Sequence, residues 1–395
     1  MPADLIRLKT EPLRSLAVPD SPHVVIGGAK LGLGGVRTHL VLLCRLLLKK
    51  NINVDLFANG SNWSKDLVDD LRQRGARIHL PPERFCGTPL LGMLYAMSYW
   101  PWQIPRQADS LYCIGPGRSH LWLHRLKPRG VLSVNHEIID GPPPASVSGR
   151  CAARLDVTIA NSRKVAQDIR KSWPHKPVRV IPFLTSDRPM PAPSRSSRPR
   201  GDLLRVSYLG RLVEHKRPQE LVLRWKTLSA LPALGSASLD VYGYDPTGEM
   251  LERLRAYVEA SGLADQIRIH GAYELNQLTG ILAETDLVVL PSLEEGLPLV
   301  LVEAMSRGVP VVATAAGGTA ELGEGNPDVI VTGTDWAGFE SGLLEMACRL
   351  RAGLIDPVRL HQWTEQRYGC AAVSRDWLQC LVDPRGFFGL LTGRT

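Results

Sequence analysis

The sequence has no long apolar run. Nowhere along its 395 residues does an uninterrupted apolar stretch reach about 18 residues, the length that a membrane-spanning helix needs. The opening residues, MPADLIRLKTEPLRSL, carry early charges and lack the apolar segment of a signal peptide. These absences predict a cytoplasmic protein, either free or peripheral to the inner face of the cytoplasmic membrane.

Cysteine pairs of the metal-binding kind are also missing. The seven cysteines are odd in number, scattered, and never spaced as Cys-x-x-Cys, which argues against a zinc site and against a disulfide framework. The ten histidines show no metal-ligand spacing either. The sequence therefore gives no reason to expect a metal or any other cofactor.

Acidic residues are in the minority. Lys and Arg number 47 against 39 Asp and Glu, for a formal net charge of +8, and this excess attracts nucleic acid, an anionic membrane or phosphorylated small substrates. The basic residues are dispersed and lack interleaved aromatics, apart from a cluster at Arg195, Arg198 and Arg200. This dispersion argues against a nucleic-acid partner.

Short apolar runs alternate with helical patterns through the first half of the chain. Because strands that alternate with helices favour a parallel sheet with crossover helices, we expect a doubly wound, Rossmann-like lobe. A long apolar helix is expected after residue 37, and charged helices at 64–74 and 162–172. The expected strands are 22–27, 53–59, 76–80, 110–115, 130–135, 156–161 and 178–183.

The alternation stops at residues 185–201, which hold four prolines, four serines and four arginines. This composition predicts a linker between an N-terminal lobe, 1–184, and a C-terminal lobe, 202–365. A late amphipathic helix at 368–380 suggests that residues 366–395 cross back to the first lobe. In the second lobe we expect strands at 204–210, 238–243, 266–271, 286–292, 310–314 and 328–332, and helices at 217–229, 247–261, 274–283 and 298–307.

Two carboxylates, Glu295 and Glu303, follow the expected strand 286–292. Pro298 suits the first position of a helix, so Glu295 is expected in the loop and Glu303 inside the helix. Free backbone N–H groups from Gly296 to Val300 would then attract an anion at the positive helix end. Two acceptor carboxylates beside such a site suit a diphosphate flanked by two hydroxyl-bearing sugars. The alternative is a solvated acidic loop before a core helix.

Arg211 and Lys216 stand after the first strand of the second lobe. Open α/β sheets bind ligands beyond the carboxyl ends of their strands, so both cations are placed for a diphosphate. A guanidinium grips two phosphate oxygens and an ammonium adds a compact charge, which together could stabilise a departing nucleoside diphosphate without a metal. A basic surface turn is the alternative.

A glycine-rich stretch, Gly27 to Gly35, precedes the first long helix. The third glycine of a dinucleotide fingerprint would fall at Arg37, so a nicotinamide site is poorly supported. The glycines more simply allow a phosphate or sugar to approach backbone N–H groups. At the end of another first-lobe strand, His136 could hydrogen-bond a sugar hydroxyl or the reacting carbon, or be an ordinary satisfied polar residue.

Taken together, these residues resemble the retaining glycosyltransferases of family 4, with the GT-B fold of two Rossmann-like lobes and a cleft between them. Glu295 to Glu303 resembles that family's paired-glutamate motif, and Arg211 with Lys216 its phosphate-binding pair. Further similarities are the glycine loop Gly34-Gly35-Val36, the strand end Asn161-Ser162, and the turn Gly317-Gly318 followed by Glu321.

The resemblance implies metal-free transfer of a hexose-type sugar from a nucleotide sugar, with retention, to a saccharide or lipid-linked saccharide, as in cell-envelope or exopolysaccharide synthesis. It implies catalytic roles for His136, Arg211, Lys216 and Glu295. The implied donor-binding residues also include Gly34, Gly35, Gly271, Ala272, Tyr273, Gly296, Leu297, Pro298, Leu299, Val300 and Glu303. Two positions depart from the family's common pattern: Pro298 replaces a glycine, and Arg37 replaces an acidic residue.

Other functions remain open at this stage. A GT-B sugar-nucleotide epimerase would use the same donor site without an acceptor, and a non-catalytic nucleotide-sugar or glycan-binding protein would keep only the binding. The uncharged stretch 88–105 holds two tryptophans and two tyrosines. It is either buried packing or, with the basic excess, a surface that contacts an anionic membrane.

Overall fold

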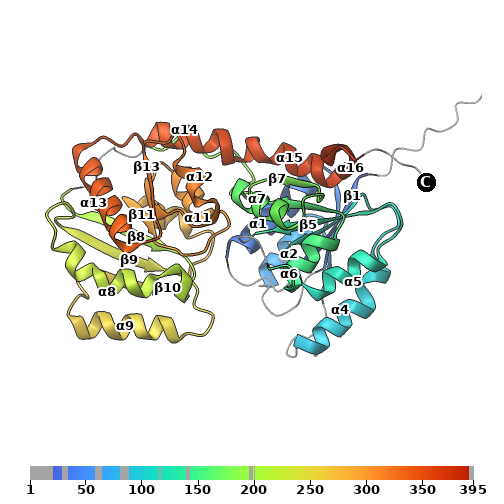
Figure 1. Cartoon of the computed structure of the whole chain (residues 1–395), viewed down its shortest axis with the longest axis horizontal. Helices are drawn as coiled ribbons and strands as arrows, with labels where there is room; N and C mark the ends of the chain where they lie inside the picture. Colours follow the sequence, from blue (N-terminus) through green and yellow to red (C-terminus); the bar gives the residue numbers. More distant parts are fainter. Residues whose placement is uncertain are drawn as a thin grey trace, which may run out of the picture.

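The computed structural model describes residues 21–28, 34–57, 65–80, 89–114, 117–138, 143–194, 199 and 201–390. They form two α/β lobes that lie side by side, with a run of C-terminal helices along one edge of both (Figure 1). The two parallel-sheet lobes confirm the predicted fold class.

The first lobe is built on a parallel sheet with the order β3-β2-β1-β4-β5-β6-β7. Its strands are mostly buried on both faces, which explains their near-continuous apolar sequences. The strands are β1 (His23–Gly28), β2 (Asn53–Phe57), β3 (Arg77–His79), β4 (Ser110–Ile114), β5 (Leu132–Glu137), β6 (Val157–Ala160) and β7 (Val178–Val180).

Crossover helices cover both faces of this sheet. Helix α1 buries the apolar run from Leu40 to Leu47, and α7 begins where Ser162 Oγ accepts a hydrogen bond from Val165 N at 3.2 Å. The helices are α1 (Gly35–Lys49), α2 (Lys65–Gln73), α4 (Pro89–Gln103), α5 (Arg118–Leu126), α6 (Val147–Arg154) and α7 (Arg163–Ser172). Helices α4, α5 and α6 were not among the predicted elements.

The second lobe repeats the plan with the order β10-β9-β8-β11-β12-β13. Strand order reverses between β8 and β11, so the crevice beyond their carboxyl ends is the expected ligand site. The strands are β8 (Leu204–Leu209), β9 (Ala237–Tyr242), β10 (Ile267–Gly271), β11 (Leu287–Leu290), β12 (Val311–Thr314) and β13 (Val329–Thr332).

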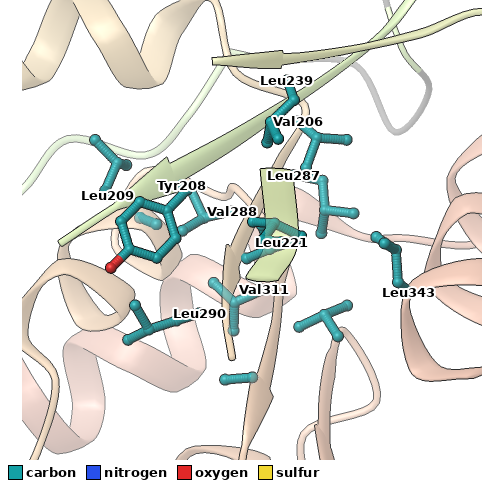
Figure 2. Packing of buried hydrophobic residues seen from close by; sticks show 14 of the residues in the cluster. Val206, Tyr208, Leu209, Leu221, Leu239, Leu287, Val288, Leu290, Val311 and Leu343 are labelled. Carbon is teal, nitrogen blue, oxygen red and sulfur yellow. The ribbon is translucent and has the colours of Figure 1, made fainter. Parts of the chain in front are cut away.

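Aliphatic side chains from neighbouring strands and helices fill the core of the second lobe. Figure 2 shows Val206, Leu287 and Val288 among them, with the Tyr208 ring at one side and its phenol oxygen pointing away from the aliphatic cluster. The helices are η2 (Glu214–Lys216), α8 (Pro218–Ser229), α9 (Glu249–Ser261), α10 (Leu278–Ala283), α11 (Leu299–Met305), η3 (Gly317–Thr319), α12 (Ala320–Gly323) and α13 (Trp336–Ala352).

The C-terminal helices tie the lobes together. Helix α14 (Pro357–Tyr368) packs against α11, and α15 (Cys370–Val382) and α16 (Pro384–Phe388) lie on the first lobe (Figure 1). Trp377 is fully buried in the first-lobe core, and Ser110 Oγ donates a hydrogen bond to Leu381 O at 2.7 Å. The chain therefore passes between the lobes twice, near residues 185–201 and again after Tyr368.

One sequence prediction, the position of Pro298, needs correction, and two others fall on residues that the structure does not describe. Pro298 was predicted at the first helical position, but its extended backbone (φ −72°, ψ 108°) makes it the N-cap, and α11 begins at Leu299. The linker cluster Arg195, Arg198 and Arg200 lies outside the described residues, as do residues 29–33 of the glycine-rich stretch. No helix in the described ranges is long and apolar enough to cross a membrane.

Candidate functional site

An ion pair lies at the switch point of the second lobe, the place beyond β8 and β11 where the strand order reverses. Lys216, in the 3-10 turn after β8, places Nζ 2.7 Å from Glu295 Oε1 in the loop after β11. The two side chains are only 11% and 12% exposed. Two loops from adjacent strands thus bring together residues that sequence reasoning had placed in separate motifs.

Neighbouring groups hold this pair in position. Lys216 Nζ also donates to Glu294 O at 2.6 Å, and Ser292 Oγ donates to Glu295 Oε1 at 2.8 Å. Burial lowers the pKa of Lys216, and the Glu295 carboxylate opposes that shift. An ammonium has three N–H donors, so after these two contacts one remains for a ligand.

Arg211 follows β8 and is exposed, and its charge adds to the lowering of the Lys216 pKa, so the two cations lie near one another. Its backbone carbonyl accepts a hydrogen bond from the buried Tyr208 hydroxyl at 3.0 Å, which fixes the turn that follows β8. An exposed guanidinium next to a partly buried ammonium is suited to bind an anion such as a diphosphate. Tyr208 and Ser292 contribute to the site by holding its loops, and neither was a predicted site residue.

Glu303 lies inside α11 and is 6% exposed. Burial raises the pKa of Glu303 to about 7, and the Arg307 guanidinium works against this rise. The Glu303 charge in turn helps to raise the pKa of Tyr273, whose own burial is the larger cause. Tyr273 belongs to the predicted base-binding turn with Ala272 and Gly271, and Gly271 has the left-handed φ of 87°. A carboxylate and this turn thus lie close to one another beyond the sheet.

The start of α11 reaches the first lobe. Leu297 packs in the second-lobe core, whereas Leu299 belongs to the buried cluster of the first lobe. A Cβ on Gly35 would meet Leu299 Cδ1 at 2.9 Å, so glycine permits this approach between the lobes. The first backbone N–H groups of α11, at Leu299 and Val300, have no partner within the helix.

Arg37, which departs from the common pattern of the family that the sequence resembles, joins the two lobes. Its Nη2 lies 2.9 Å from Glu274 Oε2, in the loop after β10. Arg37 is 16% exposed and Glu274 is 63% exposed. Arg37 therefore has an ion-pair partner, Glu274, on the opposite lobe.

His136 is the predicted site residue that the structure does not bring to this crevice. It is fully buried on β5, its Nδ1 lies 2.6 Å from the Tyr112 hydroxyl, and its ring packs against Phe183 and Trp377. Its Nε2 is buried without a hydrogen-bond partner. The His136 side chain thus packs under α15 with one ring nitrogen satisfied and the other not, and its catalytic role stays a prediction.

Three buried histidines make the protein sensitive to acid. Burial lowers the pKa of His136 to about 3 and that of His120 to about 4, and the pKa of His39 also lies well below its usual value. In the unfolded chain these groups titrate near 6.5, so below that pH only the unfolded state takes up protons. We expect His120 and His136 each to cost about 2 kcal/mol of unfolding free energy at pH 5 relative to neutral pH, and His39 to act in the same direction.

Glu303 acts in the opposite direction, because its raised pKa lets the folded state take up a proton first. Between pH 7 and pH 5, protonation of Glu303 in the folded state adds about 2 kcal/mol to the unfolding free energy. Urea midpoints measured across that range should fall on acidification, and fall further in Glu303→Gln. Equal midpoints at pH 7 and pH 5 for both proteins would contradict this assignment.

Metal-binding side chains do not gather in the described part of the chain, where no three His, Cys, Asp or Glu residues could hold an ion together. Metal independence itself remains a prediction, which EDTA can test. Among the described residues, Arg211 and Lys216 are two cations close to one another that suit a negative ligand.

Family models match both lobes. Residues 33–183 match "Glycosyltransferase Family 4" and residues 204–348 match "Glycosyl transferases group 1". The chain therefore belongs to the family 4 glycosyltransferases with the GT-B fold.

Curated relatives carry the name D-inositol 3-phosphate glycosyltransferase. The protein of Corynebacterium jeikeium is 28% identical over 237 residues, which are 55% of this chain and 56% of the relative. The protein of Streptomyces scabiei is 26% identical over 389 residues, covering 87% and 85%. The match thus spans about half the length of several relatives and most of others.

Solved structures share the fold. TarM superposes with a TM-score of 0.72 at 12% identity, covering 93% of this chain and 98% of TarM. HepE from Anabaena, solved in complex with UDP, has a TM-score of 0.70 at 16% identity, covering 91% and 99%.

Proposed function

We propose that this protein is a retaining, metal-independent glycosyltransferase that moves a hexose-type sugar from a nucleotide sugar to a saccharide or lipid-linked saccharide. The observation that carries the proposal is the Lys216–Glu295 pair at the second-lobe switch point, with exposed Arg211 at one side and buried Glu303 in the adjoining helix. We place this transfer in the biosynthesis of cell-envelope saccharides or exopolysaccharides.

Each group has a role in this proposal. Arg211 and Lys216 contact the diphosphate together with the free N–H groups of Leu299 and Val300. Glu295 accepts hydrogen bonds from the donor sugar, and Glu303 accepts them from the ribose hydroxyls. The base lies at the turn that contains Tyr273.

Transfer then proceeds as a same-face displacement. The bond between the anomeric carbon and the phosphate oxygen breaks, and positive charge develops on the sugar ring. The acceptor hydroxyl oxygen bonds to the anomeric carbon on the same face, and its proton passes to the leaving phosphate oxygen. Arg211 and Lys216 stabilise the negative charge that grows on the diphosphate, and both lobes hold the reactants in place.

Nucleotide binding is the first test. UDP, GDP, ADP and their sugar conjugates are screened by thermal shift with and without EDTA, because a bound ligand raises the melting temperature by mass action. We expect one nucleotide to stabilise the protein equally in both buffers. A shift that EDTA abolishes would overturn metal independence, and no shift with any nucleotide would favour a degenerate binding protein.

Product analysis separates the remaining alternatives. With the donor identified, proton NMR of the product reports whether the sugar has left the diphosphate and in which anomeric configuration. The acceptor panel includes D-inositol 3-phosphate, because the curated relatives carry that name. An epimerase would leave the sugar on the diphosphate, and an inverted product would overturn retention.

Donor affinity should depend on pH through Glu303. Above its pKa of about 7 the carboxylate accepts hydrogen bonds from hydroxyl groups, and below it the group is protonated. We expect the donor KM to rise up to about tenfold between pH 8 and pH 6, and Glu303→Gln to show a high KM that is flat across this range. A wild-type KM independent of pH would contradict the ribose contact.

We propose that helices α4 and α5 form the surface that contacts an anionic membrane, so that the protein works peripherally on its inner face. Trp102 is 85% exposed, and Trp122 and Leu126 are also exposed, whereas Trp100 is fully buried. The stretch 88–105 therefore contributes to the core through Trp100 and to the surface through Trp102. Both helices lie on the side of the first lobe opposite α15 and α16 (Figure 1).

Charge around this surface matches an anionic lipid. Helix α4 has no charged residue, and the side chains of Arg106, Arg118, Arg125 and Arg129 are exposed on and beside α5. Exposed tryptophans with surrounding arginines are the composition expected of a peripheral membrane contact.

Vesicle sedimentation tests the membrane contact. At low salt we expect binding to vesicles that contain phosphatidylglycerol and none to pure phosphatidylcholine, with Trp102→Ala/Trp122→Ala reducing the partition coefficient at least about tenfold. Leu354→Ala is the matched control, because Leu354 is exposed on the second lobe. Equal partitioning of the double variant and the wild type would remove this surface from the proposal.

A further inference from the structure

The turn at Gly317 and Gly318, with Glu321 after it, has no part in the donor contacts described above. It lies instead against the first lobe, at the strand end Asn161-Ser162 that the sequence analysis also singled out. Helix α7 of the first lobe contacts the turn η3 of the second lobe, and α12 follows η3 directly (Figure 1).

Two glycines of the second lobe allow backbone contact with the first lobe. A Cβ on Gly318 would lie 2.3 Å from Ser162 Cβ, and a Cβ on Gly296 would lie 1.9 Å from Ile138 O and 2.6 Å from Asn161 Nδ2. No side chain fits at either position, since real Cβ atoms do not approach other heavy atoms below about 3 Å. Gly318 N also donates to Gly296 O at 2.6 Å, which links the two contacts.

Glu321 then binds the start of a helix on the opposite lobe. Its Oε1 accepts a hydrogen bond from Lys164 N at 3.1 Å, and its Oε2 lies 3.2 Å from Arg163 Nε. The first-turn N–H groups of α7 carry the positive end of the helix dipole, so a carboxylate is stabilising there. Glu321 is 12% exposed, and Glu324 forms a second ion pair with Arg163.

We propose that Gly318 and Glu321, with the segment Asn161 to Lys164, form an interlobe seam that holds the closed lobes and thereby positions Glu295 for transfer. Gly296 directly follows Glu295, so the seam fixes the loop that carries this carboxylate, which in turn pairs with Lys216. These are positioning residues, and this inference rests on the proposed function. Arg37 and Glu274 form a further ion pair between the lobes.

The test compares Glu321→Ala, Glu321→Gln and Gly318→Ala in the full chain. We expect kcat to fall at least about tenfold in Glu321→Ala and in Gly318→Ala, and less in Glu321→Gln, because a small misplacement of reacting groups costs rate. Affinity for the nucleoside diphosphate alone, which contacts the second lobe, should stay within about twofold. The radius of gyration by small-angle X-ray scattering should increase in both variants as the lobes separate.

Glu340→Gln is the matched control, because Glu340 pairs with Arg224 at 2.7 Å within the second lobe. It should leave kcat and the radius of gyration unchanged. An unchanged kcat in Glu321→Ala and Gly318→Ala overturns the proposal, as does a loss of nucleotide affinity equal to the loss of kcat, which would indicate a disturbed second lobe. If the wild type transfers no sugar, the proposed function fails, and the scattering measurement still decides whether the seam holds the lobes closed.

Discussion

Lys216→Ala should lower kcat for sugar transfer by about 10²- to 10³-fold, the range seen when one preorganised donor to a developing negative charge is removed. Lys216 is placed for this role by its short contacts to Glu295 Oε1 and Glu294 O, which leave one N–H free for the departing diphosphate. Steady-state kinetics with saturating donor measures the loss. A variant that keeps wild-type kcat would remove Lys216 from the mechanism.

Loss of the ammonium also leaves Glu295 without its ion-pair partner, so a fall in stability must be separated from a fall in rate. Lys216→Met/Glu295→Gln removes both charges and should restore the urea midpoint without restoring activity. Lys226→Ala is the matched control, since Lys226 is an exposed lysine on α8. It should change neither kcat nor stability by more than the experimental error.

Trp377→Ala should lower the unfolding free energy by about 3 to 5 kcal/mol. The Trp377 ring is fully buried between α15 and the first-lobe sheet, with its centroid 4.7 Å from that of His39 and 5.3 Å from that of His136. Its Nε1 also donates to Pro182 O at 2.9 Å, and that carbonyl would lose its partner. Urea unfolding measures the change.

Trp102→Ala provides the comparison, because it makes the same substitution at a tryptophan that is 85% exposed. Its unfolding free energy should stay within about 0.5 kcal/mol of the wild type. Similar losses of unfolding free energy in the two variants would mean that Trp377 does not hold α15 on the first lobe.

Strand positions could be predicted well because parallel strands are buried on both faces and leave short apolar runs in the sequence. The run at 286–292 contains β11, and that at 204–210 contains β8, so the positions of Arg211 and Glu295 after strand ends followed directly. The order of these two strands as neighbours also follows from the doubly wound pattern.

The face on which His136 lies could not be predicted. Along β5, successive side chains point to opposite faces, and both faces are buried, so Asn135 and His136 look equivalent in sequence. The structure directs His136 to the face that α15 covers, and this depends on a helix more than 200 residues later in the chain. A contact at that separation leaves no signal in a single sequence.

Contacts between loops were likewise beyond the sequence. The Lys216–Glu295 pair joins two loops whose conformations depend on each other, as Leu293 N donates to His215 O at 2.7 Å. The first residue of α11 was misplaced by one because proline is favourable both before and at the start of a helix. The carboxylate Glu321 was seen only as part of a turn, since its partners lie on the other lobe.

The return of the C-terminal helices has a consequence for synthesis on the ribosome. The bond between Trp377 and Pro182 joins residues 195 apart, so the segment that completes the first lobe emerges long after the lobe itself. At about 5 to 20 residues per second, the nascent first lobe waits roughly 10 to 40 s with the apolar face beneath α15 uncovered. Chaperone capture and aggregation should therefore concentrate in that interval, and a chain truncated before Cys370 should depend on chaperones to stay soluble.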